Sequence, residues 1–114
     1  MKDQEPYLRH ILDAIARIET YTAGGDEAFF SDPMQQDAVV RNFEIIGEAV
    51  KHLSPAMKAT VPDVSWRKIA GMRDVLIHDY ISVRLATVWE AVEGRLSELK
   101  RAVERLLEES KGVD

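Results

Sequence analysis

The feature that most constrains the fold is a long row of apolar residues in the last third of the chain. Between residues 83 and 109 these residues are separated alternately by four and three positions, and they are Leu85, Trp89, Val92, Leu96, Leu99, Val103 and Leu106. A repeat of this kind places every member on one stripe of an α-helix, as in a coiled-coil seam. We therefore predict one helix over residues 83–109, whose apolar stripe other helices must cover.

Three further amphipathic helices are predicted upstream. The first covers about residues 3–23 and ends at the paired glycines of "AGGDE". The second covers residues 33–53 and follows Asp32, a residue type that caps helix N-termini. The third covers residues 65–80, and a short helical turn is expected before it in "KATVPDV".

These patterns define the fold class. No segment has the alternation typical of a β-strand, and 114 residues suit one domain. Four amphipathic helices with short or medium connections predict an all-α, antiparallel up-and-down four-helix bundle with an extra short helix. We expect a single helical domain over residues 1–114.

Composition excludes several classes of protein. The chain has no cysteine, so disulfides and thiolate metal sites are not available to it. No apolar run approaches the ~18 residues that cross a membrane, and the N-terminus "MKDQEPYLRH" lacks a signal-peptide pattern. We expect a cytoplasmic protein without a membrane partner.

The net charge of −5 is unevenly distributed. Residues 1–48 carry −6 and residues 85–114 carry −2, whereas residues 49–84 carry +3. An acidic chain is not typical of nucleic-acid-binding proteins, but the middle of this chain is basic. Chance clustering on a solvated face explains such a distribution equally well.

The basic region contains the segment "RDVLIHDY" at residues 73–80. Arg73 falls on the same helical stripe as Trp66, Ile69 and Leu76, so its guanidinium starts from a largely buried face. A lone buried arginine is costly unless it is paired. We therefore expect either a carboxylate from the second helix, with Glu44 and Glu48 as candidates, or a cleft or partner at this face.

Asp74 and His78 are four residues apart, so the carboxylate can hold the imidazole and favour its charged form. Arg73 and His78 are five apart, which is about 140° around a regular helix. One helix does not aim both at one small atom, whereas two copies related by a two-fold axis form one cleft. Arginine with histidine suits metal-free RNA cleavage, in which histidine moves a proton and arginine binds the phosphate.

Each of these residues also has a structural explanation. His78 can be a helix cap, Arg73 a structural ion pair and Tyr80 a packed ring. His10 and His52 lack such neighbours in the sequence and are interpreted as ordinary surface residues.

The segment "RDVLIHDY" resembles the R-x4-H-x-Y motif of the HepT-like branch of the HEPN superfamily. The surrounding segments "SWRKIAGMRDVLIHDY", "VVRNFEIIGEAVKHLS" and "VWEAVEGRL" are similar to that family too, and the resemblance covers about residues 7–107. This chain has Asp74 where asparagine is also common.

The resemblance implies a metal-independent endoribonuclease without cofactors, acting as the toxin of a toxin–antitoxin pair. It implies a homodimer with Arg73, Asp74 and His78 in a shared cleft, and RNA such as tRNA or mRNA as the substrate. The implied antitoxin is a minimal nucleotidyltransferase, which joins AMP to Tyr80 and can form a higher assembly with the dimer.

Two alternatives remain open from the sequence. The chain can be a non-catalytic companion subunit of a nucleotidyltransferase, in which Arg73 holds a nucleotide or substrate phosphate. It can also be a structural dimer in which the motif forms an ion-pair network at the interface.

Overall fold

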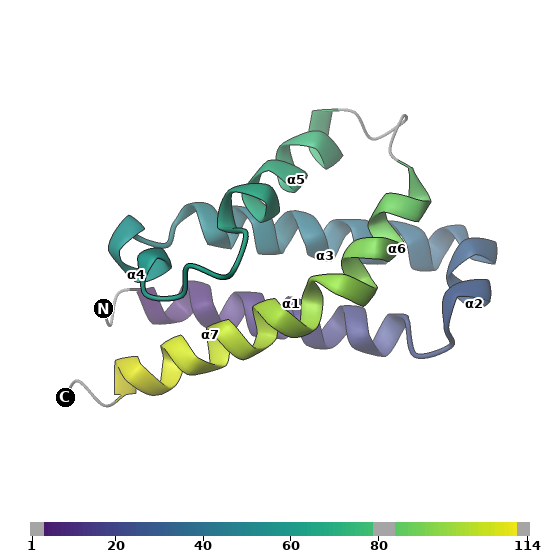
Figure 1. Cartoon of the computed structure of the whole chain (residues 1–114). Helices are drawn as coiled ribbons and strands as arrows, with labels where there is room; N and C mark the ends of the chain where they lie inside the picture. The colour runs from purple at the N-terminus through teal and green to yellow at the C-terminus, as the bar shows by residue number, and fades with distance from the viewer. Residues whose placement is uncertain (1–3, 79–83, 112–114) are drawn as a thin grey trace.

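The computed structural model of the chain describes residues 4–78 and 84–111. Seven helices and no strand occur in these ranges (Figure 1). The helices are α1 (Glu5–Tyr21), α2 (Asp26–Ser31), α3 (Pro33–Lys51), α4 (Pro55–Ala59), α5 (Trp66–His78), α6 (Leu85–Gly94) and α7 (Leu96–Lys111). The all-α bundle predicted from the sequence is confirmed. None of the helices in these ranges is long and apolar enough to cross a membrane.

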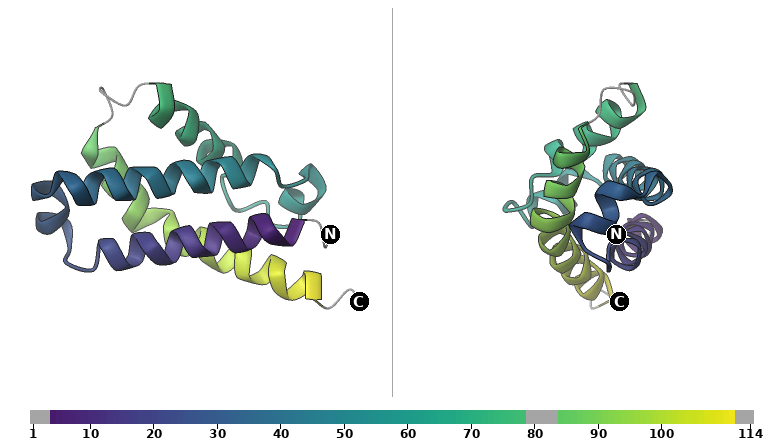
Figure 2. Two further views of the ribbon diagram at one scale, coloured as in Figure 1. Left: turned by 180° about the vertical axis from the view of Figure 1, so that it is seen from behind. Right: turned by 90° about the vertical axis from the view of Figure 1, so that its right-hand side faces the viewer.

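Four long rods make up the bundle, namely α1, α3, α5 and the α6–α7 pair. Helices α1 and α3 lie side by side and antiparallel, α5 packs on α3, and α7 crosses α1 (Figures 1 and 2). Towards its C-terminal end α5 leaves the surface of α3 and projects from the bundle (Figures 1 and 2).

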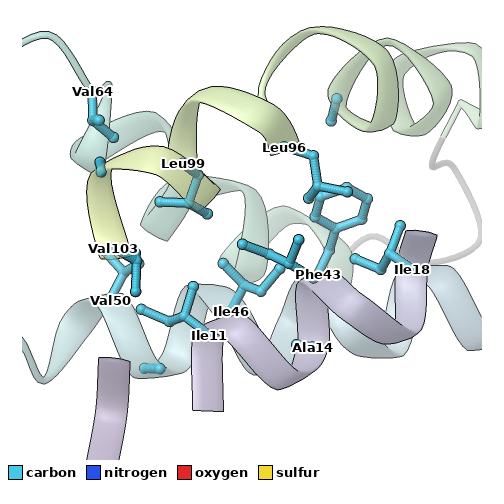
Figure 3. Packing of buried hydrophobic residues seen from close by; sticks show 14 of the residues in the cluster. Ile11, Ala14, Ile18, Phe43, Ile46, Val50, Val64, Leu96, Leu99 and Val103 are labelled. Atoms are coloured by element: carbon cyan, nitrogen blue, oxygen red, sulfur yellow. The ribbon is translucent and has the colours of Figure 1, made fainter. Parts of the chain in front are cut away.

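The core lies between α1, α3 and α7 and consists mainly of aliphatic side chains from all three helices, together with Phe43 of α3. Ile11, Ile46 and Val103, for example, are at most 1% exposed and meet in the layer that Figure 3 shows. This layer fixes the position of α3, and α3 in turn carries α5.

Local signals account for the starts of two helices. Asp32 accepts a hydrogen bond from the backbone N–H of Met34 at 3.0 Å, as expected of an N-cap. Ser54 Oγ accepts a hydrogen bond from the backbone N–H of Met57 at 3.1 Å and caps the N-terminus of α4. The extra short helix is therefore at 55–59 and shares only residues 58 and 59 with the segment 58–64, in which the sequence predicts a helical turn.

Helix α2 is not predicted from the sequence, in which no helix is expected between the glycine pair and Asp32. Its side chain Phe29 is fully buried, and its ring lies 5.2 Å from that of Trp89 in α6. The helix thus depends on a contact with a residue sixty positions away, which local pattern does not reveal.

The single helix predicted over residues 83–109 is wrong in one respect, because it is divided at Arg95 between α6 and α7. Gly94, with the lowest helix propensity of any residue but proline, precedes this point. The buried positions shift with the division. In α6 they are Val88 and Ala91, whereas in α7 the predicted Leu96, Leu99, Val103 and Leu106 are buried, and Ala102 and Leu107 are buried beside them.

The close approach of α5 to α3 requires a glycine. A Cβ atom at Gly47 would collide with Cβ of Arg73, and it would lie 3.3 Å from the carbonyl oxygen of Ile69. Neither neighbour is the movable end of a side chain, so α5 would have to shift. By contrast, a Cβ atom at Gly71 meets nothing within 4 Å.

We predict that Gly47→Ala lowers the free energy of unfolding by up to roughly 2 kcal/mol, because overpacking costs about 1–3 kcal/mol and the gain in helix propensity offsets only ~1 kcal/mol of it. Gly71→Ala is the matched control and is expected to be neutral or stabilising by up to about 1 kcal/mol. Urea unfolding of both variants measures the difference, and equal stabilities would contradict this account of the packing.

Candidate active site around Arg73

Arg73 occupies the middle of α5, directly over Gly47 of α3. Its side chain is 27% exposed, so it is neither fully buried nor free in solvent. Trp66 and Leu76 on the same stripe are buried at 8% and 2% exposure, and Ile69 is partly buried. The helical stripe predicted from the sequence is thus confirmed, with the arginine at its edge.

The carboxylate that meets Arg73 comes from Glu48. Oε2 of Glu48 lies 3.0 Å from Nε of Arg73, whereas Glu44 lies 3.7 Å from Arg41 instead. Of the two partners considered from the sequence, Glu48 is therefore the correct one. Because the Glu48 side chain is 50% exposed, we expect this pair to contribute no more than about 1 kcal/mol to stability. Its main effect is to orient the guanidinium.

Asp74 holds the guanidinium from a second side. Its Oδ1 atom accepts a hydrogen bond from NH1 of Arg73 at 3.1 Å and another from Nζ of Lys51 at 2.5 Å. The Lys51 ammonium, and after it the Arg73 guanidinium, hold the pKa of the Asp74 carboxyl below its ordinary value of 3.8.

Lys51 is a site residue that the sequence analysis did not identify. It lies four positions after Gly47, and this spacing directs both residues toward α5. The spacing between Gly47 and Lys51 predicts a contact of Lys51 with α5 only when it is known that α5 packs on this face of α3.

A groove of about 270 Å³ opens beside Arg73, and we call it the Arg73 groove. Residues of α1, α3 and α5 line it together with His52: Tyr7, His10, Arg41, Glu44, Ile45, Glu48, Ala49, His52 and Arg73. Cationic, acidic and aromatic side chains therefore meet in one place.

His10 and His52, interpreted from the sequence as ordinary surface residues, both belong to this groove. The rings of His52 and Tyr7 are stacked, with centroids 4.7 Å apart and planes 6° apart. Nε2 of His52 lies 3.3 Å from Oε1 of Glu48, whose other oxygen contacts Arg73. The spacing of four residues between Glu48 and His52 was the sequence signal for this contact.

His78 is the last residue of α5, and its side chain is outside the described part of the structure. Tyr80 lies wholly outside the described residues. Residues 73 to 78 belong to one continuous α-helix, so positions 73 and 78 are separated by about 140° around the helix axis.

The arrangement suits binding of an anion by a positioned guanidinium. Guanidinium has five N–H donors, and the contacts with Glu48 and Asp74 use one at Nε and one at NH1. The other three remain for a ligand such as a phosphate, which arginine binds in a planar, bidentate way. In residues 4–78 and 84–111, no group of three His, Cys, Asp or Glu side chains could hold a metal ion.

Comparison with known proteins gives consistent matches. The family described as "Ribonuclease HepT-like" matches residues 11–106. A protein of Caldanaerobacter subterraneus subsp. tengcongensis, provisionally named an RNase, is 41% identical over 112 residues, which cover 97% of this chain and 100% of the relative. A protein of Thermococcus cleftensis, provisionally named ribonuclease HepT, is 39% identical over 106 residues, which cover 92% of this chain and 96% of the relative.

A third relative is longer. A protein of Methanocaldococcus jannaschii, named a gamma-glutamylcyclotransferase and provisionally an RNase, is 41% identical over 109 residues. The match covers 95% of this chain but 49% of the relative, so the chain spans about half of that protein's length. No solved structure matches the chain significantly.

We predict that the contribution of Asp74 to stability depends on pH. Because its pKa is lowered in the folded state, the contribution is fully present above pH 3.8 and is lost as the pH falls through the folded pKa. Wild type should therefore be more stable than Asp74→Asn at pH 7, and the difference should shrink below pH 3.8. Urea unfolding between pH 7 and pH 3 measures this, and a difference that grows on acidification would refute the assignment.

Proposed function

The chain belongs to the HepT-like ribonuclease family, and from this membership and the arrangement of Arg73 we propose that it is a metal-independent endoribonuclease. The single observation that carries the proposal is the position of Arg73. Glu48 and Asp74 fix its guanidinium at the edge of the Arg73 groove, five residues before His78 at the end of α5. A pre-oriented guanidinium can stabilise the negative charge that develops on a phosphoryl group in the transition state.

In this proposal His78 moves protons and Arg73 binds the scissile phosphate. The imidazole of one His78 takes the proton from a ribose 2′-OH, and the 2′ oxygen attacks phosphorus. The new P–O2′ bond replaces the P–O5′ bond, and the 5′ oxygen leaves with a proton from the second His78. The products are a 2′,3′-cyclic phosphate and a 5′-hydroxyl, so no external reactant is consumed.

The proposal needs two copies of the chain. Arg73 and His78 diverge by about 140° on α5, so one copy does not direct both at the same phosphate. The end of α5 projects from the bundle, where a second copy can approach it (Figure 2). A two-fold axis at this end would bring two arginines and two histidines into one cleft.

We further propose that the chain is the toxin of a toxin–antitoxin pair, with a minimal nucleotidyltransferase as its antitoxin. In this scheme the Tyr80 hydroxyl attacks the α-phosphorus of ATP, an O–P bond forms and pyrophosphate leaves. The AMP group adds bulk and negative charge two residues after His78, which would repel RNA. The relatives are named as ribonucleases rather than as binding subunits, and these names favour the ribonuclease proposal over the companion-subunit alternative.

We predict that wild-type protein cleaves single-stranded RNA in EDTA and leaves 2′,3′-cyclic phosphate ends. His78→Ala and Arg73→Ala should each reduce the rate by at least about 100-fold, the usual contribution of a general acid–base or an oriented donor. Gel analysis at matched dimer concentration, checked by light scattering, measures the rates. Replacement of the 2′-OH by hydrogen in the substrate should abolish cleavage.

Two results of the cleavage assay would contradict the proposal in whole or in part. Absence of cleavage by a folded, dimeric and unmodified wild-type protein would contradict the ribonuclease proposal and favour the companion-subunit alternative. Equal cleavage by wild type and His78→Ala would contradict only the proposed role of His78 and would leave the ribonuclease proposal standing.

We predict that co-expression with the cognate nucleotidyltransferase and ATP raises the mass of the protein by one or more AMP groups and abolishes its RNA cleavage. Tyr80→Phe should gain no AMP at this position and should remain active in the presence of the transferase. Intact-mass and peptide mass spectrometry locate the group. An unchanged mass of wild type, or AMP on another residue only, would count against Tyr80 as the acceptor.

A further inference from the structure

A second groove lies next to the candidate active site, and we call it the basic groove. It has a volume of about 520 Å³ and is lined by side chains of α3, α4 and α5: Lys51, Lys58, Trp66, Arg67, Ala70, Gly71 and Asp74. Arg73 lines the Arg73 groove and Asp74 lines the basic groove, so the ion pair between them separates the two.

The charge of the basic groove is positive. It has three cationic side chains and one carboxylate, and that carboxylate already contacts Lys51 and Arg73. Within residues 4–78 and 84–111, neither Lys58 nor Arg67 has a carboxylate at ion-pair distance. Two cations therefore face the groove without a counter-ion from the described part of the chain.

The lining of the groove suits a phosphate chain better than a base. Ala70 and Gly71 line it, and the side of Gly71 where a Cβ atom would lie is open, so a ligand can approach the helix backbone. Trp66 is 8% exposed, and its Nε1–H group donates to the carbonyl oxygens of Lys58 and Val61. This buried ring is a wall of the groove and offers little surface for a base to stack on.

The groove is long enough for a short stretch of RNA backbone. Arg67 and Asp74 are seven residues apart on α5, which corresponds to about 10 Å along the helix axis. This length can hold neighbouring phosphates of a single strand. The groove ends beside Arg73, so a strand that follows it arrives at the proposed scissile phosphate.

We propose that the basic groove binds the phosphate backbone of the single-stranded RNA substrate, immediately beside the phosphate held by Arg73. This inference rests on the proposed ribonuclease function and adds a binding site to it. It also gives a reason for the +3 charge of residues 49–84 in a chain of net charge −5. The cations are collected where the RNA passes, while the rest of the surface stays acidic.

The first test measures RNA binding in the full-length His78→Ala protein, which should bind without cleavage. We expect the double substitution Lys58→Gln/Arg67→Gln to weaken binding of a labelled single-stranded RNA roughly tenfold. The slope of log affinity against log salt should fall in magnitude by about 1.4, since each lost phosphate contact in a single strand removes ~0.7. The matched control Arg101→Gln/Arg105→Gln removes two exposed cations from α7 and should change neither quantity.

A second pair of variants separates charge from bulk. Gly71→Glu places a carboxylate in the basic groove, and Gly71→Gln places a neutral side chain of the same size there; the Cβ atom meets nothing within 4 Å in either case. We expect Gly71→Glu to weaken RNA binding several-fold more than Gly71→Gln. Light scattering checks that both remain dimers.

The outcomes distinguish this inference from the proposed function. If wild type cleaves RNA while the double variant binds RNA like its control, the basic groove is not the backbone site and the ribonuclease proposal stands. If unmodified dimeric wild type neither binds nor cleaves RNA, both proposals fall. If the double variant keeps its RNA affinity but no longer associates with the nucleotidyltransferase, the groove is a protein interface and our inference is overturned.

Discussion

The packing of α5 on α3 at Gly47 is the constraint on which the candidate site depends. Without a Cβ atom at position 47, Arg73 comes close enough for its guanidinium to reach Glu48 on the same helix as the glycine. Lys51, one turn further along α3, then reaches Asp74. A larger residue at position 47 would separate the helices and break these contacts together, although it lies outside the groove itself.

The ion pairs at this contact orient side chains more than they stabilise the fold. Arg73 is 27% exposed and Glu48 and Asp74 are about half exposed, so water screens their interactions. The core of α1, α3 and α7 supplies the stability, as its fully buried aliphatic side chains indicate. This division leaves the polar residues free to serve a ligand: two carboxylates hold one arginine, and its other three N–H donors remain available.

Two departures from the predicted helices come from tertiary packing. The seam over residues 83–109 reads as one helix, but α6 turns at Gly94 and Arg95 so that Trp89 meets Phe29 while α7 covers α1. The same aromatic contact supports α2, a six-residue helix whose existence no local pattern reveals. In both cases the deciding contact joins residues that are far apart in the chain. The periodicity of a single sequence gives no information about such long-range contacts.

The sequence by itself determined the helical class, the N-cap at Asp32, the helical stripe that contains Arg73, and the family, because periodicity and motif are local properties. It narrowed the partner of Arg73 to Glu44 or Glu48 without choosing between them. Tertiary structure chose Glu48, added Lys51, and brought Tyr7, His10 and His52 into the groove beside Arg73. These contacts depend on how closely α5 approaches α3. The space at Gly47 and the packing of the core beneath it determine this distance.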